Sequence, residues 1–218
     1  MIGVVRVVTL ADPSLLAEHG NLISSKYGLE TTSRSIPDQP FGIHNDETEQ
    51  IAVPKIIELA EQFEKDGAKA VVISCAADPA VAELRERLNI PVIGAGSAAA
   101  LVAQGLGLQT GVLGITDDAP QVVKDTLGNL LTGYAHPRGV ENTTDLLTPE
   151  GRKQAIEAAR SLLEQGAQAI LFACTGYSTI GLADVLRAEL GCVVIDAVEA
   201  EGLFTWYAAQ TLSVGANT

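Results

Sequence analysis

Short apolar runs rich in β-branched residues alternate along the chain with longer stretches in which apolar residues recur at helical spacing. Each run is bounded by glycine or proline, and together they predict buried strands at residues 4–10, 70–74, 91–94, 111–115, 169–173 and 193–196. Helical spacing is clear in two of the intervening stretches, 51–63 and 155–162. Continuous apolar strands separated by amphipathic helices are typical of parallel sheets covered on both faces, so we predict the α/β class.

Capping side chains followed by proline mark the beginnings of two helices. Asp78-Pro79 and Thr148-Pro149 each predict a helix in which the carboxylate or the hydroxyl is the N-cap. The glycine-rich segment 94–99 lacks the surroundings of a dinucleotide-binding fingerprint, and we interpret it as a structural turn. The stretch 131–147 has no clear period, so we predict a loop that joins two halves of the chain.

These two halves resemble each other. Residues 66–75, DGAKAVVISC, align without a gap on residues 165–174, QGAQAILFAC, with Gly, Ala, Ala and Cys at the same offsets. Cys75 and Cys174 are therefore in register. A repeat of this length is too long for a solenoid unit and indicates a duplicated α/β lobe.

Two such lobes would face each other across a cleft, with equivalent strand ends on either side. Because open α/β sheets bind ligands at the carboxyl ends of their strands, we expect the active site in this cleft. We assign residues 1–103 and 208–218 to the first lobe and residues 104–207 to the second, and leave open whether the lobes exchange segments.

Cys75 and Cys174 each follow a predicted strand and precede a predicted helix. Backbone N–H groups at a helix N-terminus stabilise anions, so we expect them to lower the pKa of these thiols and to hold a substrate oxygen. An isolated cysteine is most often a small buried apolar residue. A thiol repeated in both lobes instead favours a pair in which one group acts as a base and the other as an acid. Cys192 has apolar neighbours, and we interpret it as a core residue.

Charge and composition exclude several classes of partner. The 218 residues carry 27 acidic and 14 basic side chains, a net charge of −13, with no cluster of Lys and Arg. We therefore expect neither nucleic acid nor an anionic membrane as a partner. The apolar N-terminal segment is too short to span a bilayer and lacks signal-peptide features, and three cysteines make a poor disulfide framework, so we expect a cytoplasmic protein. The three histidines show no metal-ligand spacing, so no metal is expected.

The segments around the two cysteines are similar to those of a known family. Residues 73–79, ISCAADP, with residues 90–94, IPVIG, resemble the first cysteine motif of hydantoin racemases in the aspartate/glutamate racemase superfamily. Residues 173–178, ACTGYS, resemble the second motif, and the resemblance extends over nearly the whole chain. It implies a cofactor-independent racemase in which one cysteine removes a proton from the stereocentre and the other protonates the opposite face.

The same resemblance implies that small-molecule substrates bind between the lobes and that the protein is a homo-oligomer. It implies that the substrate contacts, mainly backbone N–H groups and hydroxyls, come from Gly42, Ile43, Ser74, Ala76, Ala77, Thr116, Thr175 and Gly176.

The expected substrate is a 5-substituted hydantoin or allantoin. Gly176 stands where amino-acid racemases of the superfamily place a histidine, which lowers the case for glutamate or aspartate, and Cys75 speaks against arylmalonate decarboxylases. Racemisation of an open-chain amino acid and cis-trans isomerisation of maleate remain alternatives. A different class of protein also remains open, a non-catalytic binder of small molecules built on the two lobes.

Overall fold

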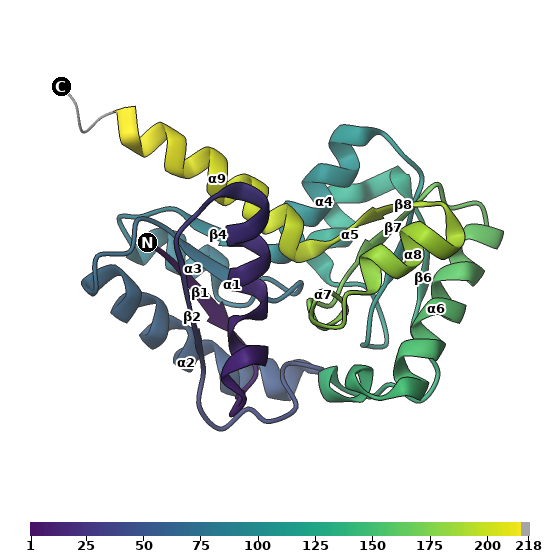
Figure 1. Ribbon diagram of the computed structural model, residues 1–218, viewed down its shortest axis with the longest axis horizontal. Coiled ribbons are helices and arrows are strands. Elements are labelled where there is room, and N and C mark those ends of the chain that lie inside the picture. Colours follow the sequence, from purple (N-terminus) through teal and green to yellow (C-terminus); the bar gives the residue numbers. More distant parts are fainter. Residues whose placement is uncertain (215–218) are drawn as a thin grey trace.

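The chain forms two four-stranded parallel sheets with the same strand order, one in each lobe (Figure 1). The order is β2-β1-β3-β4 in the first sheet and β6-β5-β7-β8 in the second. This computed structural model describes residues 1–214, with side chains described up to residue 210. The strands are β1 (Ile2–Arg6), β2 (Thr31–Ser35), β3 (Val71–Ser74), β4 (Val92–Gly94), β5 (Thr110–Leu113), β6 (Leu131–Ala135), β7 (Ala169–Phe172) and β8 (Val193–Ile195). The two-lobed α/β prediction is confirmed.

Helices cover both faces of each sheet. α2 packs on β1 and β3, and α1 and α9 pack over the opposite face; in the second lobe α6 packs on β5 to β7, and α4 packs over the opposite face. Among the described residues no helix is long and apolar enough to cross a membrane. The helices are α1 (Pro13–Tyr27), α2 (Asp46–Lys65), α3 (Val81–Arg87), α4 (Ala95–Leu106), α5 (Gln121–Leu127), α6 (Pro149–Glu164), α7 (Gly176–Thr179), α8 (Leu182–Leu190) and α9 (Ala197–Val214), with short 3-10 helices η1 (Gly128–Leu130) and η2 (Thr143–Leu147).

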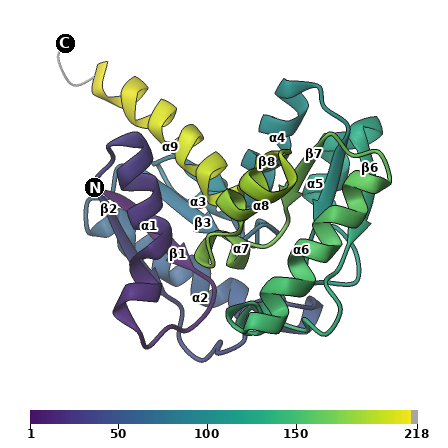
Figure 2. The ribbon, with the colours of Figure 1, turned by 45° about the vertical axis from the view of Figure 1, so that its right-hand side comes forward.

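Two helices cross from one lobe to the other. α4 leaves the first sheet after β4 and packs on β7 and α5 of the second lobe, whereas α9 leaves the second sheet after β8 and lies along α1, β3 and β4 of the first (Figure 2). The two crossing helices also pack against each other. A single apolar core consequently includes Val72 and Ile93 from the first sheet and Val112 and Leu171 from the second.

The lobe boundaries assigned from the sequence, at 103/104 and 207/208, stay a prediction. The last segment of that assignment contains residues 215–218, which lie outside the described residues. In the described part of the chain, the return to the first lobe begins with α9 at Ala197.

Two of the four edge strands, β2 and β6, differ from the sequence predictions. Residues 131–147 do not form a loop, because they contain β6 and η2, and β2 was not predicted at all. Both strands pair with the sheet along one side only and are half-buried, and β2 has the polar sequence TTSRS. Strands of this kind lack the continuous apolar run by which a buried strand is recognised.

Asp78 caps a different helix from the one predicted. α3 begins at Val81 without a side-chain cap, whereas the carboxylate of Asp78 accepts hydrogen bonds from the backbone N–H groups of Gly96 (2.6 Å) and Ser97 (2.9 Å) at the start of α4. Segment 94–99 is therefore the strand end and first turn of α4, onto which the loop after β3 docks. The Thr148 cap is confirmed, since its hydroxyl accepts a hydrogen bond from the N–H of Gly151 (3.0 Å).

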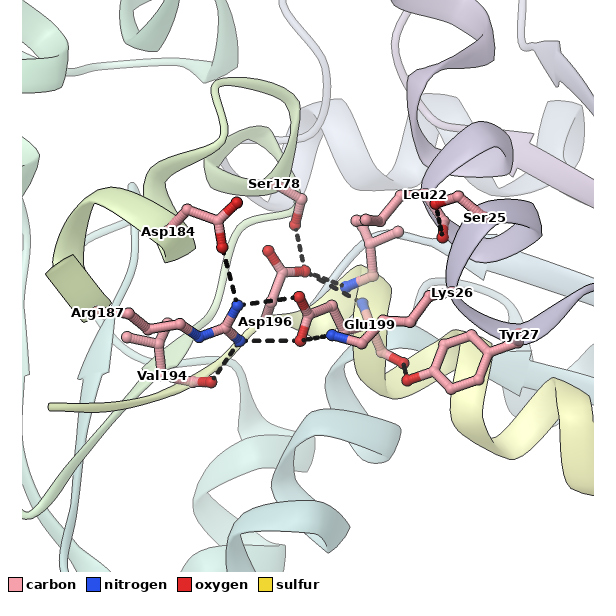
Figure 3. A network of polar contacts seen from close by, with 11 residues as sticks. Leu22, Ser25, Lys26, Tyr27, Ser178, Asp184, Arg187, Val194, Asp196 and Glu199 are labelled. Carbon is pink, nitrogen blue, oxygen red and sulfur yellow. Dashed lines mark hydrogen bonds and ion pairs between the residues drawn. The ribbon is translucent and has the colours of Figure 1, made fainter.

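The second lobe has an equivalent helix cap, but its carboxylate lies at the end of the strand before the crossing helix rather than in the segment after the cysteine. Asp196 directly follows β8, and its Oδ1 accepts hydrogen bonds from the N–H groups of Val198 (2.8 Å) and Glu199 (3.2 Å) at the start of α9. Ser178, from the segment after the second cysteine, donates its hydroxyl to the same oxygen at 2.6 Å (Figure 3). Each cysteine-bearing segment is thus fastened by a carboxylate to the N-terminus of a crossing helix.

An ion-pair network next to this cap joins the two lobes (Figure 3). Arg187 of α8 donates to both carboxylate oxygens of Glu199, at 3.1 and 2.9 Å, and the Nζ of Lys26 on α1 lies 2.7 Å from the same carboxylate. Burial acts to raise the pKa of Glu199, but hydrogen bonds from Arg187 and Lys26 outweigh it and lower that pKa. Tyr27 donates its hydroxyl to the backbone oxygen of Glu199 at 2.7 Å, so α9 is held by side chains of both lobes.

Candidate active site

The two cysteines occupy equivalent positions at the carboxyl ends of two central strands. Cys75 directly follows β3, and Cys174 follows β7 after one residue. Both strands are paired on each side by parallel neighbours, so their ends and the segments after them are fixed by the sheets. The two thiols are free and buried, and both line one cleft with a volume of about 730 Å³.

The structure brings every residue that was expected to contact the substrate to this cleft. Its walls include the loop before α2, the segment after β5 and the two cysteine turns, by which we mean residues 74–77 and 173–176. The roles of these residues toward a substrate stay a prediction. The members of this set are Gly42, Ile43, Ser74, Ala76, Ala77, Thr116, Thr175 and Gly176. Cys192 lies away from the cleft and packs, partly buried, against the core of the second lobe.

Several other residues of the cleft were not identified from the sequence. They include residues from the end of β1 and the segment after it, the N-cap and first turn of α2, the segment between β5 and α5, α5 itself, and η2. The signals that could have pointed to two of these segments are the capping boxes that begin at Asn45 and Asn142. The residues are Arg6, Val7, Val8, Asn45, Asp46, Glu47, Glu49, Asp117, Asp118, Gln121, Lys124 and Thr143.

Burial raises the pKa of both thiols. In Cys75 the backbone N–H of Ala77 only partly offsets burial. In Cys174 burial raises the pKa to about 11, although the N–H of Gly176, whose nitrogen is 3.4 Å from Sγ, and the side chain of Thr143 oppose it. The expected lowering by a helix N-terminus is wrong, because loss of water around the thiols outweighs the few N–H groups. Burial therefore favours the protonated thiol at both cysteines, whereas removal of a substrate proton requires one of them as a thiolate.

Five carboxylates line the cleft, and the lysine and arginine side chains that line it already have partners. Lys124 lies 2.6 Å from Asp118, and the guanidinium of Arg6 donates to the carbonyl oxygens of Leu15 (2.8 Å) and Leu16 (3.1 Å). The site is therefore poor in partners for a substrate with several negative charges. The acidic side chains that line the cleft are Asp46, Glu47, Glu49, Asp117 and Asp118.

Residues 24–201 match the family described as Asp/Glu/Hydantoin racemase. The chain belongs to this family. It is 29% identical over 193 residues to the hydantoin racemase of Pseudomonas sp. (strain NS671), covering 84% of this chain and 75% of that protein, and 30% identical over 175 residues to the hydantoin racemase of Rhizobium meliloti, covering 75% and 69%. The solved structure of allantoin racemase from Klebsiella pneumoniae shares the fold with a TM-score of 0.80 and 21% identity, over 98% of this chain and 88% of that one.

The family resemblance inferred from the cysteine motifs is confirmed, and the protein is an isomerase of the racemase type. In this racemase the two lobes, the repeated cysteine turns and the shared cleft form one site. Two buried thiols line this cleft from opposite halves of the chain.

Proposed function

We propose that this racemase inverts the C5 stereocentre of a 5-substituted hydantoin or of allantoin, without a cofactor, using Cys75 and Cys174 as the two bases. The observation that carries the proposal is the presence of two thiols at equivalent positions of both lobes in a single cleft. One thiolate removes the C5 proton, and the C–H electron pair moves toward the adjacent carbonyl to give an enolate. The opposite thiol then protonates C5 from the other face and becomes the thiolate.

Backbone N–H groups are the donors that we propose for the enolate oxygen. The hydroxyls near the cysteines already have protein partners: Ser74 bonds to Glu201 (2.7 Å) and His19 (2.7 Å), Thr116 donates to the carbonyl of Asp118 (2.8 Å) and Thr175 donates to the carbonyl of Ser74 (3.1 Å). The N–H groups of Ala76 and Thr175 directly follow the two cysteines. Donors fixed in place before the reaction stabilise a developing negative charge without reorganisation.

The charges that line the cleft support a neutral ring over a dicarboxylate as the substrate. Maleate, glutamate and aspartate carry two carboxylates, and each would meet five carboxylates in the cleft, whose Lys124 and Arg6 already have partners. A hydantoin ring presents carbonyl and N–H groups without such charge. For the same reason we rank maleate and open-chain amino acids below hydantoins and allantoin as substrates.

A substrate screen in D₂O tests this proposal. We expect loss of optical rotation and deuterium incorporation at C5 with hydantoins or allantoin, at least about tenfold faster per enzyme than any change in glutamate, aspartate or maleate. Iodoacetamide should abolish the activity, and substrate should protect it. Preference for a dicarboxylate would contradict the assignment, and thermal stabilisation by a ligand without turnover would favour a non-catalytic binder.

We also propose that the racemase acts in a reducing cytoplasm as a homo-oligomer. Three free thiols support the compartment, and the exposed apolar side chains of Leu203 (41% exposed) and Trp206 (39%) on α9 support self-association. Sedimentation velocity at micromolar concentration should give at least twice the 22.7 kDa of one chain. A single species with the mass of one chain would contradict this expectation.

A further inference from the structure

A buried chain of polar side chains runs behind the cysteine turns and joins both lobes. Glu201 on α9 bonds through Oε1 to the hydroxyl of Ser74 at 2.7 Å, and Nδ1 of His19 on α1 lies 2.7 Å from the same hydroxyl. The Nε2 of His19 lies 2.8 Å from the hydroxyl of Thr179 at the end of α7. Glu201 is 0% exposed, and Ser74 and His19 are each 1% exposed. Four elements therefore meet in one polar cluster, of which Glu201, Ser74 and His19 are excluded from water.

This cluster is attached to both cysteine turns. Ser74 is the residue before Cys75, and its backbone carbonyl accepts the hydroxyl of Thr175, the residue after Cys174, at 3.1 Å. Thr179 ends the short helix that begins directly after Thr175. A shift of any member would move one turn relative to the other.

Glu201 lacks the partners that an ionised carboxylate requires. Its Oε2 is buried without a hydrogen-bond partner among the described residues, and Ser74 is its partner at Oε1. Burial raises the pKa of Glu201 well above its ordinary value and lowers that of His19 well below it. The charged or titratable groups that face Glu201 are Arg6 on β1, which favours ionisation, Asp78 and Asp196, which oppose it, and His19 through Ser74; α4 contributes none.

We propose that Glu201, Ser74 and His19 are positioning residues that hold the two cysteine turns in the arrangement needed for proton transfer, with Glu201 present as a neutral carboxylic acid. With a proton on Oε1, Glu201 donates to Ser74, Ser74 donates to Nδ1 of His19, and Nε2 of His19 donates to Thr179. The oxygen left without a donor is then a carbonyl, which costs less to bury unpaired than half of a carboxylate. The catalytic part of this inference rests on the proposed function, whereas the charge state of Glu201 does not.

The charge state is tested by urea unfolding of the wild type and of Glu201→Gln across pH. A carboxyl group that is neutral in the folded protein binds a proton that the unfolded chain releases above about pH 4.5, so its contribution to stability is lost as pH rises. Between about pH 5.5 and pH 7.5, the unfolding equilibrium constant of the wild type, divided by that of Glu201→Gln, is expected to rise about tenfold per pH unit. A ratio independent of pH would overturn the proposal.

Glu199→Gln is the matched control on the same helix. Glu199 is held ionised by Arg187 and Lys26, and its pKa is lowered, so it carries the same charge in both states over this pH range. The corresponding ratio for this variant should be flat. His19 is present in every protein compared, so its own titration cancels from each ratio.

The positioning role is tested by steady-state kinetics of Ser74→Ala with the substrate that the wild type racemises. If Ser74 acts through the cysteine turns, kcat should fall by about tenfold or more while KM changes by less than about threefold. Glu201→Gln, which can still donate to Ser74, should recover most of the kcat that Glu201→Ala loses. A rise in KM at unchanged kcat would make Ser74 a substrate contact instead. Absence of turnover in the wild type would reject the proposed function and leave the unfolding result to decide the charge state of Glu201.

Discussion

Replacing either Cys75 or Cys174 with alanine is expected to lower the rate of racemisation by about three to four orders of magnitude, because each thiol serves one face of the stereocentre. Each variant retains one thiol, which can still remove a proton from one face of C5 and return it to the same face. Cys75→Ala and Cys174→Ala should therefore exchange the C5 hydrogen of opposite enantiomers with D₂O, without inverting either one. Proton NMR of each pure enantiomer in D₂O, compared with its spontaneous exchange, measures this directly.

Cys192→Ala is the control for the loss of a thiol. Cys192 packs partly buried in the second lobe, with Sγ 3.9 Å from the carbonyl oxygen of Leu186, and does not line the cleft. It should racemise at the wild-type rate. If Cys75→Ala and Cys174→Ala also do so, the assignment of the two bases is wrong.

Gly96→Ala is expected to destabilise the protein by at least about 3 kcal/mol. A Cβ at this position would overlap the backbone carbonyl of Ala76, the residue after Cys75, and would press on the Asp78 carboxylate that caps α4. The closest atoms belong to the backbone of Ala76 and cannot rotate away, so the segment after Cys75 must move or the helix must shift. Urea unfolding gives the change in free energy, and activity of the remaining folded protein should fall with the displaced turn.

The matched substitution in the same helix is Gly105→Ala. Gly105 is exposed near the end of α4, and no atom lies within 4 Å of a Cβ placed there. Alanine is a better helix former than glycine, so this variant should be more stable than the wild type by about 0.5 to 1 kcal/mol. Equal effects at positions 96 and 105 would show that the docking of the Cys75 turn on α4 contributes nothing to stability.

The sequence was informative where strands are buried on both faces. The central strands could be predicted because runs such as VVIS at 71–74 and AILF at 169–172 are continuously apolar, and the repeat placed the two cysteines on equivalent strand ends. The polar edge strand TTSRS carries no such pattern. Its pairing is decided by the neighbouring backbone rather than by its own side chains.

Contacts between distant segments could not be predicted. Asp78 stands before a proline in a typical capping pattern. It nevertheless caps α4 by accepting a hydrogen bond from Gly96, which lies 18 residues further along the chain. The thiol pKa values depend on how completely the folded lobes exclude water, which local sequence does not encode. The cluster of Glu201, Ser74 and His19 joins α9, β3 and α1 and likewise exists only after folding.

The exchange of α4 and α9 between the lobes has a consequence for cooperativity. Each sheet is covered on one face by a helix that the other half of the chain supplies, and Val72, Ile93, Val112 and Leu171 share one core. Either half alone would expose this apolar surface to water, so separation of the halves is opposed by the hydrophobic effect. The internal duplication has therefore produced one folding unit rather than two independent ones, and loss of structure in one lobe is transmitted to the other.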